Sequence, residues 1–386
     1  MFFIQHGFGK SDKIDRLAET TQIAGVILSP AHEDAARLRE TADRSRNLGL
    51  KVLLDPQSYI YSLAPQGTAR HHAANGLEFG DMHWSQSAET LTSHVAAVQH
   101  SNARTGTDAL ISPSPFQGAF PDYWLSVSMQ YARSSASSWG GNRTLVSLVV
   151  DESILRSWDH TQEWMDVLTT INCRGFYLLV NRRNQQYPAG AWDPVALTNL
   201  LRLIYTLAGL NVYELYWGYS DIDGLCGLSA GATGIASGWA YGLRGFSVAK
   251  WNEHRSGGAP PTPRVFTPSL WSPLRLTEAN DLSSSPLGRS SLPLTLVHNL
   301  AERPMDSWSI VDAQLQHLAQ LAYEADRVTS EPGLRERVES AIDSLLNAAS
   351  ILQELDSHGY TLDRRYAARV DSYLRAMEAF GESESL

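Results

Sequence analysis

Residues 144–152 read TLVSLVVDE. The run is apolar over most of its length, is rich in β-branched residues and ends on two carboxylates. A strand that is apolar on both faces is typical of a parallel sheet covered by helices on both sides. Residues 158–171 follow it with the spacing of an amphipathic helix. The stretch therefore predicts one strand–helix unit of an α/β fold.

Similar units recur along residues 1–251. The eight apolar runs cover residues 2–4, 25–28, 51–55, 109–112, 144–152, 175–181, 212–218 and 233–238, and a helical pattern follows most of them, the last over residues 239–251. Eight units in about 250 residues are typical of a TIM-type (β/α)8 barrel, which here starts at residue 2. A doubly wound open sheet is the alternative. Its dinucleotide-binding form is disfavoured because no Gly-x-Gly-x-x-Gly follows the first run.

Two segments depart from this pattern, and a helical region follows them. Residues 56–87 are too long for an ordinary connection between a strand and a helix, and we expect them over the barrel mouth. Residues 252–310 are rich in Pro, Ser and Gly but also contain Phe266, Trp271 and Trp308. They predict a connector packed on the barrel.

Residues 311–386 have the spacing of amphipathic helices. They carry 14 acidic and 7 basic side chains, so seven of the ten net negative charges lie there. We predict an acidic helical appendage that docks on the barrel or on another subunit.

Composition narrows the function classes. The net charge of −10 argues against generic nucleic-acid binding, which needs clustered cations. No run approaches the roughly 18 apolar residues of a membrane span, and no secretory leader precedes the first run. We therefore expect a cytoplasmic protein without a membrane partner.

Cys173 and Cys226 are too few for a disulfide scaffold or a cysteine-based zinc cluster and are expected to be buried thiols. The cofactor, if any, stays unknown.

The strongest catalytic candidates are Asp55 and Asp151. Each ends an apolar run at the edge where barrels keep their reacting groups, and both belong to odd-numbered strands that can share a layer. A carboxyl group in a dry cavity has a raised pKa suited to acid–base work. Glu152 and His6 are expected to support them. The alternative is that each aspartate only caps the following turn.

A carboxylate pair suggests glycosidic chemistry or cation binding. Because the first run has no His-x-His, we predict no metal site. Ligand-binding candidates follow the third, sixth, seventh and eighth runs, where arginine forks and glycine-rich loops suit anions. They are Tyr59, Asn181, Arg182, Arg183, Trp217, Tyr219, Ser220, Ser237 and Gly238. The alternative for the two arginines is ordinary solvation at the surface.

The leading hypothesis is a barrel enzyme, a hydrolase or a glycosyl-transfer enzyme. It would act at the mouth on a small glycosidic, nucleoside-like or phosphorylated ligand through carboxylate acid–base or nucleophilic chemistry. The sequence leaves open whether the chain is catalytic at all. The alternative is a non-catalytic barrel subunit that docks on a protein partner, or on a second copy, through the helical tail and the connector.

Overall fold

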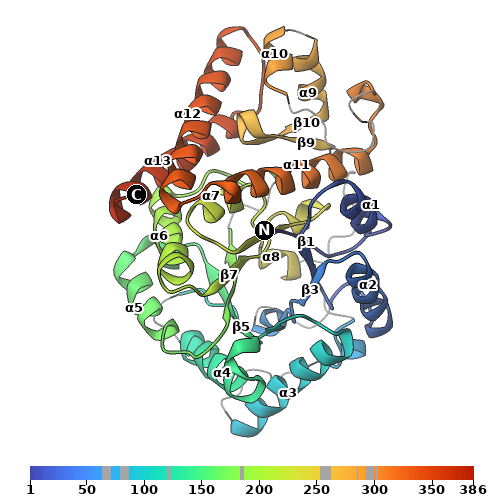
Figure 1. Cartoon of the computed structure of the whole chain (residues 1–386), viewed down its shortest axis with the longest axis vertical. Coiled ribbons are helices and arrows are strands. Elements are labelled where there is room, and N and C mark those ends of the chain that lie inside the picture. The colour runs from blue at the N-terminus through green and yellow to red at the C-terminus, as the bar shows by residue number, and fades with distance from the viewer. Residues whose placement is uncertain are drawn as a thin grey trace.

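The computed structural model describes residues 1–62, 71–78, 87–119, 123–182, 187–252, 262–284, 286–292, 300 and 303–386. Eight parallel strands form a nearly closed barrel in the order β3-β2-β1-β8-β7-β6-β5-β4 (Figure 1). The strands are β1 (Phe2–Gln5), β2 (Gly25–Leu28), β3 (Lys51–Leu54), β4 (Leu110–Ile111), β5 (Thr144–Asp151), β6 (Gly175–Asn181), β7 (Glu214–Trp217) and β8 (Gly234–Ser237). The predicted TIM-type barrel that starts at residue 2 is confirmed.

One residue links the two ends of the sheet. Asp108, just before β4, donates its backbone N–H to the carbonyl of Val52 in β3 at 2.9 Å. Its carboxylate accepts from the backbone N–H of Val52 at 2.6 Å. The short β4 therefore meets β3 through an aspartate side chain, which satisfies a strand N–H that would otherwise lack a partner.

Helices surround the barrel, and several begin at a polar cap. The side chains of Asp34, Ser87, Ser157 and Asp193 each accept from a backbone N–H of the first turn that follows. Such caps satisfy donors that have no partner within the helix. The helices between strands are α1 (Lys13–Thr20), α2 (Ala35–Asn47), α3 (Ala88–Thr105), α4 (Tyr123–Trp139), α5 (Trp158–Leu168), α6 (Pro194–Ile204) and α7 (Asp223–Ser229).

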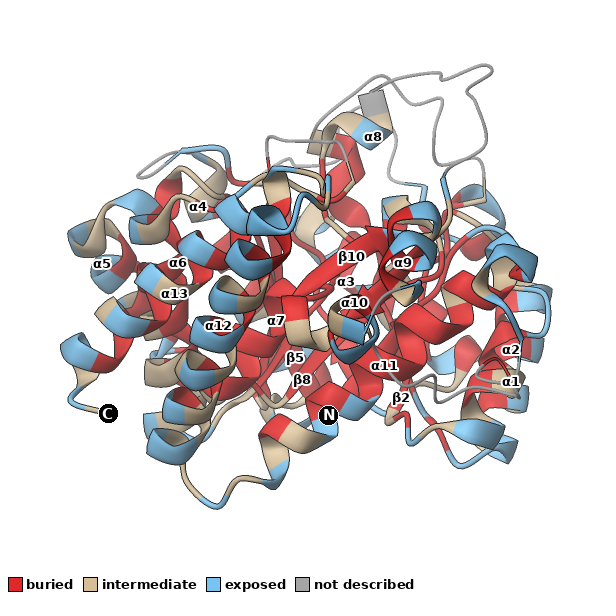
Figure 2. Cartoon of the chain, turned by 90° about the horizontal axis from the view of Figure 1, so that it is seen from above, coloured by how far each residue is buried: buried red, intermediate tan, exposed pale blue. Residues whose placement is uncertain are grey.

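The eighth helix of the barrel is not where the sequence predicted it. Residues 239–251 form only a 3-10 turn, Tyr241–Leu243, and the four-residue α8 (Ala249–Asn252). Gly242 and Gly245 disfavour a helix there. Instead α11 (Ile310–Ser330) packs against β1, α1 and α7 (Figure 1). It is buried along most of its length (Figure 2).

The remaining C-terminal elements pack around α11 and α6. They are β9 (Arg264–Thr267), β10 (Ser272–Arg275), α9 (Leu276–Ser283), α10 (Pro286–Ser290), α12 (Leu334–Ser357) and α13 (Arg365–Glu384). β9 and β10 pair antiparallel, and β9 joins α11 through two 2.9 Å hydrogen bonds between Gln316 and the backbone of Phe266. Phe266, Trp271 and Trp308 are buried in the main hydrophobic core. The exact boundaries of connector and appendage stay a prediction.

The core holds almost every strand residue, which Figure 2 shows as a continuous buried band inside the helices. Cys173 and Cys226 are buried and unpaired, as predicted. None of the described helices combines the length and the apolar character that crossing a membrane requires. The cytoplasmic location stays a prediction.

Candidate active site

Asp55, directly after β3, is buried within a cluster of phenols. Tyr59 and Tyr177 donate their hydroxyls to Oδ2 of Asp55 at 3.1 and 3.3 Å. The backbone N–H of Gln57 donates to Oδ1 at 3.0 Å. The hydroxyl of Tyr177 also lies 3.5 Å from Oε1 of Gln5. Side chains from β1, β6 and the end of β3 therefore meet inside the barrel.

The environment of Asp55 changes its acidity. Its side chain is fully buried, and burial raises the pKa of its carboxyl to about 7 even though three hydrogen bonds act in the opposite direction. Burial and the neighbouring Asp55 raise the pKa values of Tyr59 and Tyr177 well above that of a free phenol. Asp55 is therefore the group of this cluster that exchanges a proton near neutral pH.

Tyr219 extends this cluster toward two cavities that it lines. Its hydroxyl accepts a 3.4 Å hydrogen bond from Nε2 of Gln57 and lies within hydrogen-bonding reach of Tyr59. Gln57 and Tyr219 both have left-handed backbones, with φ of 53° and 54°. Such conformations cost free energy in non-glycine residues and are concentrated at functional sites. Asp55 is 1 % exposed, so Tyr219 is the member of this cluster that faces the cavities described below.

Asp151 belongs to a second network at the end of β5. Its Oδ2 accepts from Nδ2 of Asn181 at 2.7 Å, and its Oδ1 accepts from the backbone and hydroxyl of Ser153. Asn181 in turn accepts the backbone N–H of Val248 through Oδ1 at 2.9 Å. Asp151 thus caps the following turn and fixes Asn181, which holds the loop after β8. The hydrogen bonds of Asp55 described above lead to Gln57, Tyr59 and Tyr177, so the predicted pairing of the two aspartates stays a prediction.

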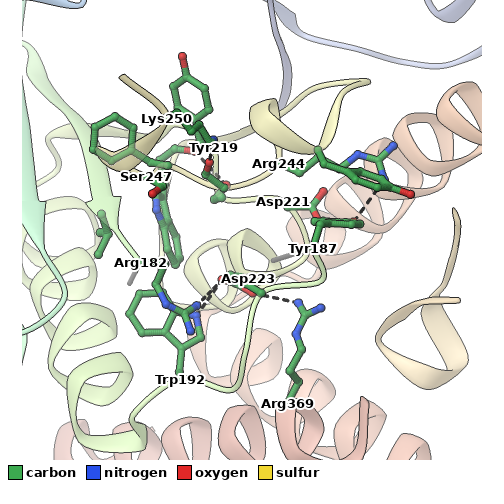
Figure 3. Close-up of a pocket in the computed structure, with 17 residues that line it drawn as sticks. Arg182, Tyr187, Trp192, Tyr219, Asp221, Asp223, Arg244, Ser247, Lys250 and Arg369 are labelled. Carbon is green, nitrogen blue, oxygen red and sulfur yellow. Dashed lines mark hydrogen bonds and ion pairs between the residues drawn. The ribbon is translucent and has the colours of Figure 1, made fainter. Parts of the chain in front are cut away.

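Asp223 joins the barrel to the C-terminal helices. Its Oδ2 accepts from Nη1 of Arg182 at 3.1 Å and from the indole of Trp192 at 2.8 Å. Its Oδ1 accepts from Nη2 of Arg369 at 3.2 Å and from the hydroxyl of Tyr373. All four donors surround one carboxylate (Figure 3 shows three of them). Removing one partner of such a buried ion pair is strongly destabilising, because it leaves an uncompensated buried charge.

Asp221 is a second buried carboxylate with partners from distant elements. Ser237 of β8 and His317 of α11 bind its Oδ1 at 2.7 and 2.6 Å, and Tyr187 donates to Oδ2 at 2.9 Å. Although burial acts the other way, His317 and Arg244 hold the pKa of Asp221 well below its usual range. Burial lowers the pKa of His317 to about 4. At neutral pH the pair is therefore a carboxylate and a neutral imidazole.

A narrow cavity opens between these carboxylates and the ends of β6 and β7 (Figure 3). Arg182, Arg244 and Arg369 all line it. Arg182 stacks on Trp192 at 3.8 Å and forms an ion pair with Glu152 at 2.8 Å. Arg244 donates to the carbonyl of Gly238 at 3.0 Å. Three guanidinium groups and two carboxylates, those of Asp221 and Asp223, therefore line one small cavity, and the guanidinium groups are the donors that an anion would use.

His6 lies apart from the Asp55 cluster. Its Nε2 is 3.4 Å from Oε2 of Glu33, and its Nδ1 accepts the backbone N–H of Ser29 at 3.4 Å. Its ring packs edge-on against Trp239. Neighbouring His6 and Lys10 lower the pKa of Glu33 to about 2, although burial opposes this shift. The contacts of His6 therefore tie β1 to the loop after β2.

The structure places the described candidates at the C-terminal ends of the strands, as barrels require, but in separate networks. Tyr59, Tyr219 and Asp55 come together; Glu152 pairs with Arg182; Ser237 binds Asp221. Ser220 lines the cavity and donates its hydroxyl to the carbonyl of Trp217. Arg183 lies outside the described residues. These placements do not test the predicted roles.

Sequence reasoning missed several residues of the site. They are Gln57, Tyr177, Tyr187, Trp192, Arg244, His317 and Arg369. Tyr177 could have been found, because it lies within the sixth apolar run and its side chain ends in a polar hydroxyl. His317 and Arg369 come from helices whose spacing gave no sign of contact with the mouth.

Within the described ranges, no group of three or more His, Cys, Asp or Glu side chains is arranged to hold a metal ion. No protein-family model matches the chain, and a search of curated proteins finds no match. Among solved structures, the chain is similar to a thiamine phosphate pyrophosphorylase from Pyrococcus furiosus, with 10 % identity over 64 % of this chain and 89 % of that one and a TM-score of 0.32. It is also similar to a dihydrodipicolinate synthase from Oceanobacillus iheyensis, with 9 % identity over 100 % of this chain and 97 % of that one and a TM-score of 0.33. At such scores, neither likeness carries a conclusion about activity.

Proposed function

We propose that the protein is an enzyme that moves a proton to or from a small anionic ligand held at the barrel mouth. The observation that carries this proposal is the buried carboxyl of Asp55 at the end of β3, which accepts hydrogen bonds from the hydroxyls of Tyr59 and Tyr177. Burial raises the pKa of this carboxyl to about 7. A group of that pKa gains and loses a proton readily at neutral pH, as a general acid–base needs. Strand ends at the barrel mouth are where such groups act in this fold.

The proton would travel through hydroxyl groups, because the carboxyl of Asp55 is covered. In the direction of base catalysis, the phenolic oxygen of Tyr219 takes the ligand proton and passes its own to Tyr59. Tyr59 passes its proton along its 3.1 Å hydrogen bond to Oδ2 of Asp55. Each phenol gains one proton as it loses another, so the only net change in the protein is protonation of Asp55. The reverse sequence supplies a proton to the ligand.

An anionic ligand fits the lining of the mouth. Arg182, Arg244 and Arg369 offer cationic donors at one cavity. Of the ligand classes considered from the sequence, phosphorylated molecules therefore fit better than neutral glycosides. Hydrolysis and glycosyl transfer stay predictions, as does the alternative of a non-catalytic subunit.

The test is turnover of a panel of sugar phosphates and nucleoside monophosphates in deuterated buffer, followed by NMR and mass spectrometry. We expect product formation or deuterium incorporation with at least one compound. Asp55→Asn and Tyr219→Phe should lower that rate about 100-fold or more. Asp43→Asn, at an exposed carboxylate of α2, is the matched control and should not change it. Full activity of Asp55→Asn would overturn the proposal.

A further inference from the structure

We propose that the mouth binds a nucleotide-like ligand, with a planar aromatic ring in one cavity and a phosphate group beside Arg244 and Arg369 in the next. This inference rests on the proposed function, since it names the ligand class of the same site. It follows from two cavities of opposite chemistry that share a wall.

The first cavity has aromatic walls and a free volume of about 200 Å³. The rings of His32 and Trp251 lie nearly parallel, with 6.4 Å between centroids, and Phe8 meets His32 edge-on at 6.2 Å. Tyr219 and Phe246 complete the wall. Phe8 is 73 % exposed, so its ring is accessible to a ligand. Flat walls of this kind favour a planar ring that stacks between them.

The second cavity is narrower, with a free volume of about 50 Å³, and its lining is charged: Arg182, Arg244, Arg369 and Lys250 lie there with the carboxylates of Asp221 and Asp223. Arg244 is 4 % exposed; it donates to the carbonyls of Gly238 and Trp239 and to the hydroxyl of Tyr187, and its positive charge lies close enough to Asp221 to lower the pKa of that carboxyl. Nη1 of Arg369 is buried without a hydrogen-bond partner in the described part of the chain. Because Nη1 of Arg369 still has a donor to offer, a ligand anion that reaches it gains a charge-assisted hydrogen bond. The volume suits a compact group such as a phosphate.

The two cavities are neighbours. Tyr219, Phe246 and Lys250 line both of them. The centroids of the Tyr219 and Phe246 rings are 5.8 Å apart, so the two cavities meet at one pair of aromatic side chains. We infer that a single molecule reaches past this pair, with a ring in one cavity and a charged group in the other. A free phosphate would leave the aromatic cavity empty, and a neutral aromatic would leave Nη1 of Arg369 without a hydrogen-bond partner.

Isothermal titration calorimetry tests the inference on the full-length Asp55→Asn variant, in which turnover does not disturb binding. The probes are AMP, GMP, CMP and UMP, the four matching nucleosides, and ribose 5-phosphate. We expect at least one monophosphate to bind 10-fold or more tightly than both its nucleoside and ribose 5-phosphate. If all four monophosphates bind no tighter than ribose 5-phosphate, the inference is wrong.

Variants in the same background separate the two halves of the ligand. Phe8→Ala and Trp251→Ala should weaken the monophosphate about 10-fold and leave ribose 5-phosphate unchanged. Arg244→Gln should weaken both phosphates and leave the nucleoside unchanged. Tyr323→Ala removes an exposed ring of α11 and should change none of them. Because Phe8 is exposed, its variant is expected to fold, and equal weakening of ribose 5-phosphate by Phe8→Ala would overturn the inference.

The inference and the proposed function can fail separately. If monophosphates bind as expected but no compound is turned over by the wild type, only the proposed function fails. If the wild type turns over a sugar phosphate that has no aromatic ring, and the monophosphates bind no better, only the inference fails.

Discussion

The hydroxyl of Tyr177 lies 3.3 Å from Oδ2 of Asp55, although the two residues are 122 positions apart in the sequence. The hydrogen bond crosses the interior of the barrel from β6 to the end of β3. The pKa of the Asp55 carboxyl therefore depends on a hydroxyl that another strand of the barrel supplies. Four predictions follow from this arrangement and from its links to the C-terminal helices.

The pH dependence of stability should reveal the pKa of Asp55. Its folded pKa of about 7 exceeds the unfolded value of about 3.9, so the folded state holds a proton between these pH values that the unfolded state has lost. The contribution of Asp55 to the free energy of unfolding therefore falls as pH rises from about 4 to about 7. The total change is a few kcal/mol, since each pKa unit is worth about 1.4 kcal/mol.

Urea unfolding of wild type and Asp55→Asn between pH 4.5 and 8 measures this contribution. The difference between the two proteins is the quantity to follow, because burial lowers the pKa of His32, His72 and His317 and these histidines have the opposite pH dependence. We expect the variant to gain stability relative to the wild type as pH rises. A difference that does not vary with pH would contradict the raised pKa.

Tyr177→Phe should raise the pKa of Asp55 above about 7. The variant removes one of the hydrogen bonds that favour the ionised carboxylate, while burial is unchanged. The pKa can be measured from the ¹³C shift of the Asp55 carboxyl. Tyr213→Phe is the control, since that hydroxyl donates to the carbonyl of Thr169 away from the site. An equal pKa in wild type and Tyr177→Phe would show that the hydrogen bond has no effect.

Gly218→Ala should disturb the hydrogen bond between Tyr177 and Asp55, because the added methyl group would crowd the hydroxyl of Tyr177. A Cβ atom at residue 218 would lie 2.5 Å from the hydroxyl oxygen of Tyr177 and 2.7 Å from Cδ2 of Leu179. Overpacking of this kind costs about 1–3 kcal/mol. Gly118→Ala, whose added Cβ would make an ordinary 3.5 Å contact with Phe116, is the control. Thermal unfolding of both variants checks the prediction, which fails if both are equally stable.

Asp223→Asn should lower the free energy of unfolding by about 3–5 kcal/mol. The variant leaves two buried guanidinium groups, those of Arg182 and Arg369, without their shared carboxylate. Asp371→Asn removes an exposed partner of Arg375 in α13 and should cost less than about 1 kcal/mol. Urea unfolding at neutral pH measures both, and similar losses in the two variants would contradict a structural role for Asp223.

The sequence predicted the barrel well, because each strand leaves a pattern within a short stretch of residues. Each strand is an apolar run, and the runs 51–55 and 144–152 lie within a residue of β3 and β5. The sequence predicted the eighth helix over residues 239–251, where glycines disfavour a full helix. The helix that takes its place, α11, begins some 60 residues later. Local spacing shows that α11 is a helix, but not which strand it covers.

The same distinction between local pattern and tertiary packing holds for the candidate site. By itself, the sequence determined the strands, their order along the chain and the polar residues at each strand end, since periodicity and the barrel rule need only neighbouring residues. The tertiary structure decided which of those residues meet. It brought Tyr177 to Asp55 across the barrel and Arg369 to Asp223 from a helix 146 positions away. The raised pKa of Asp55 arises from burial, and burial is a property of the packed molecule that no stretch of sequence contains.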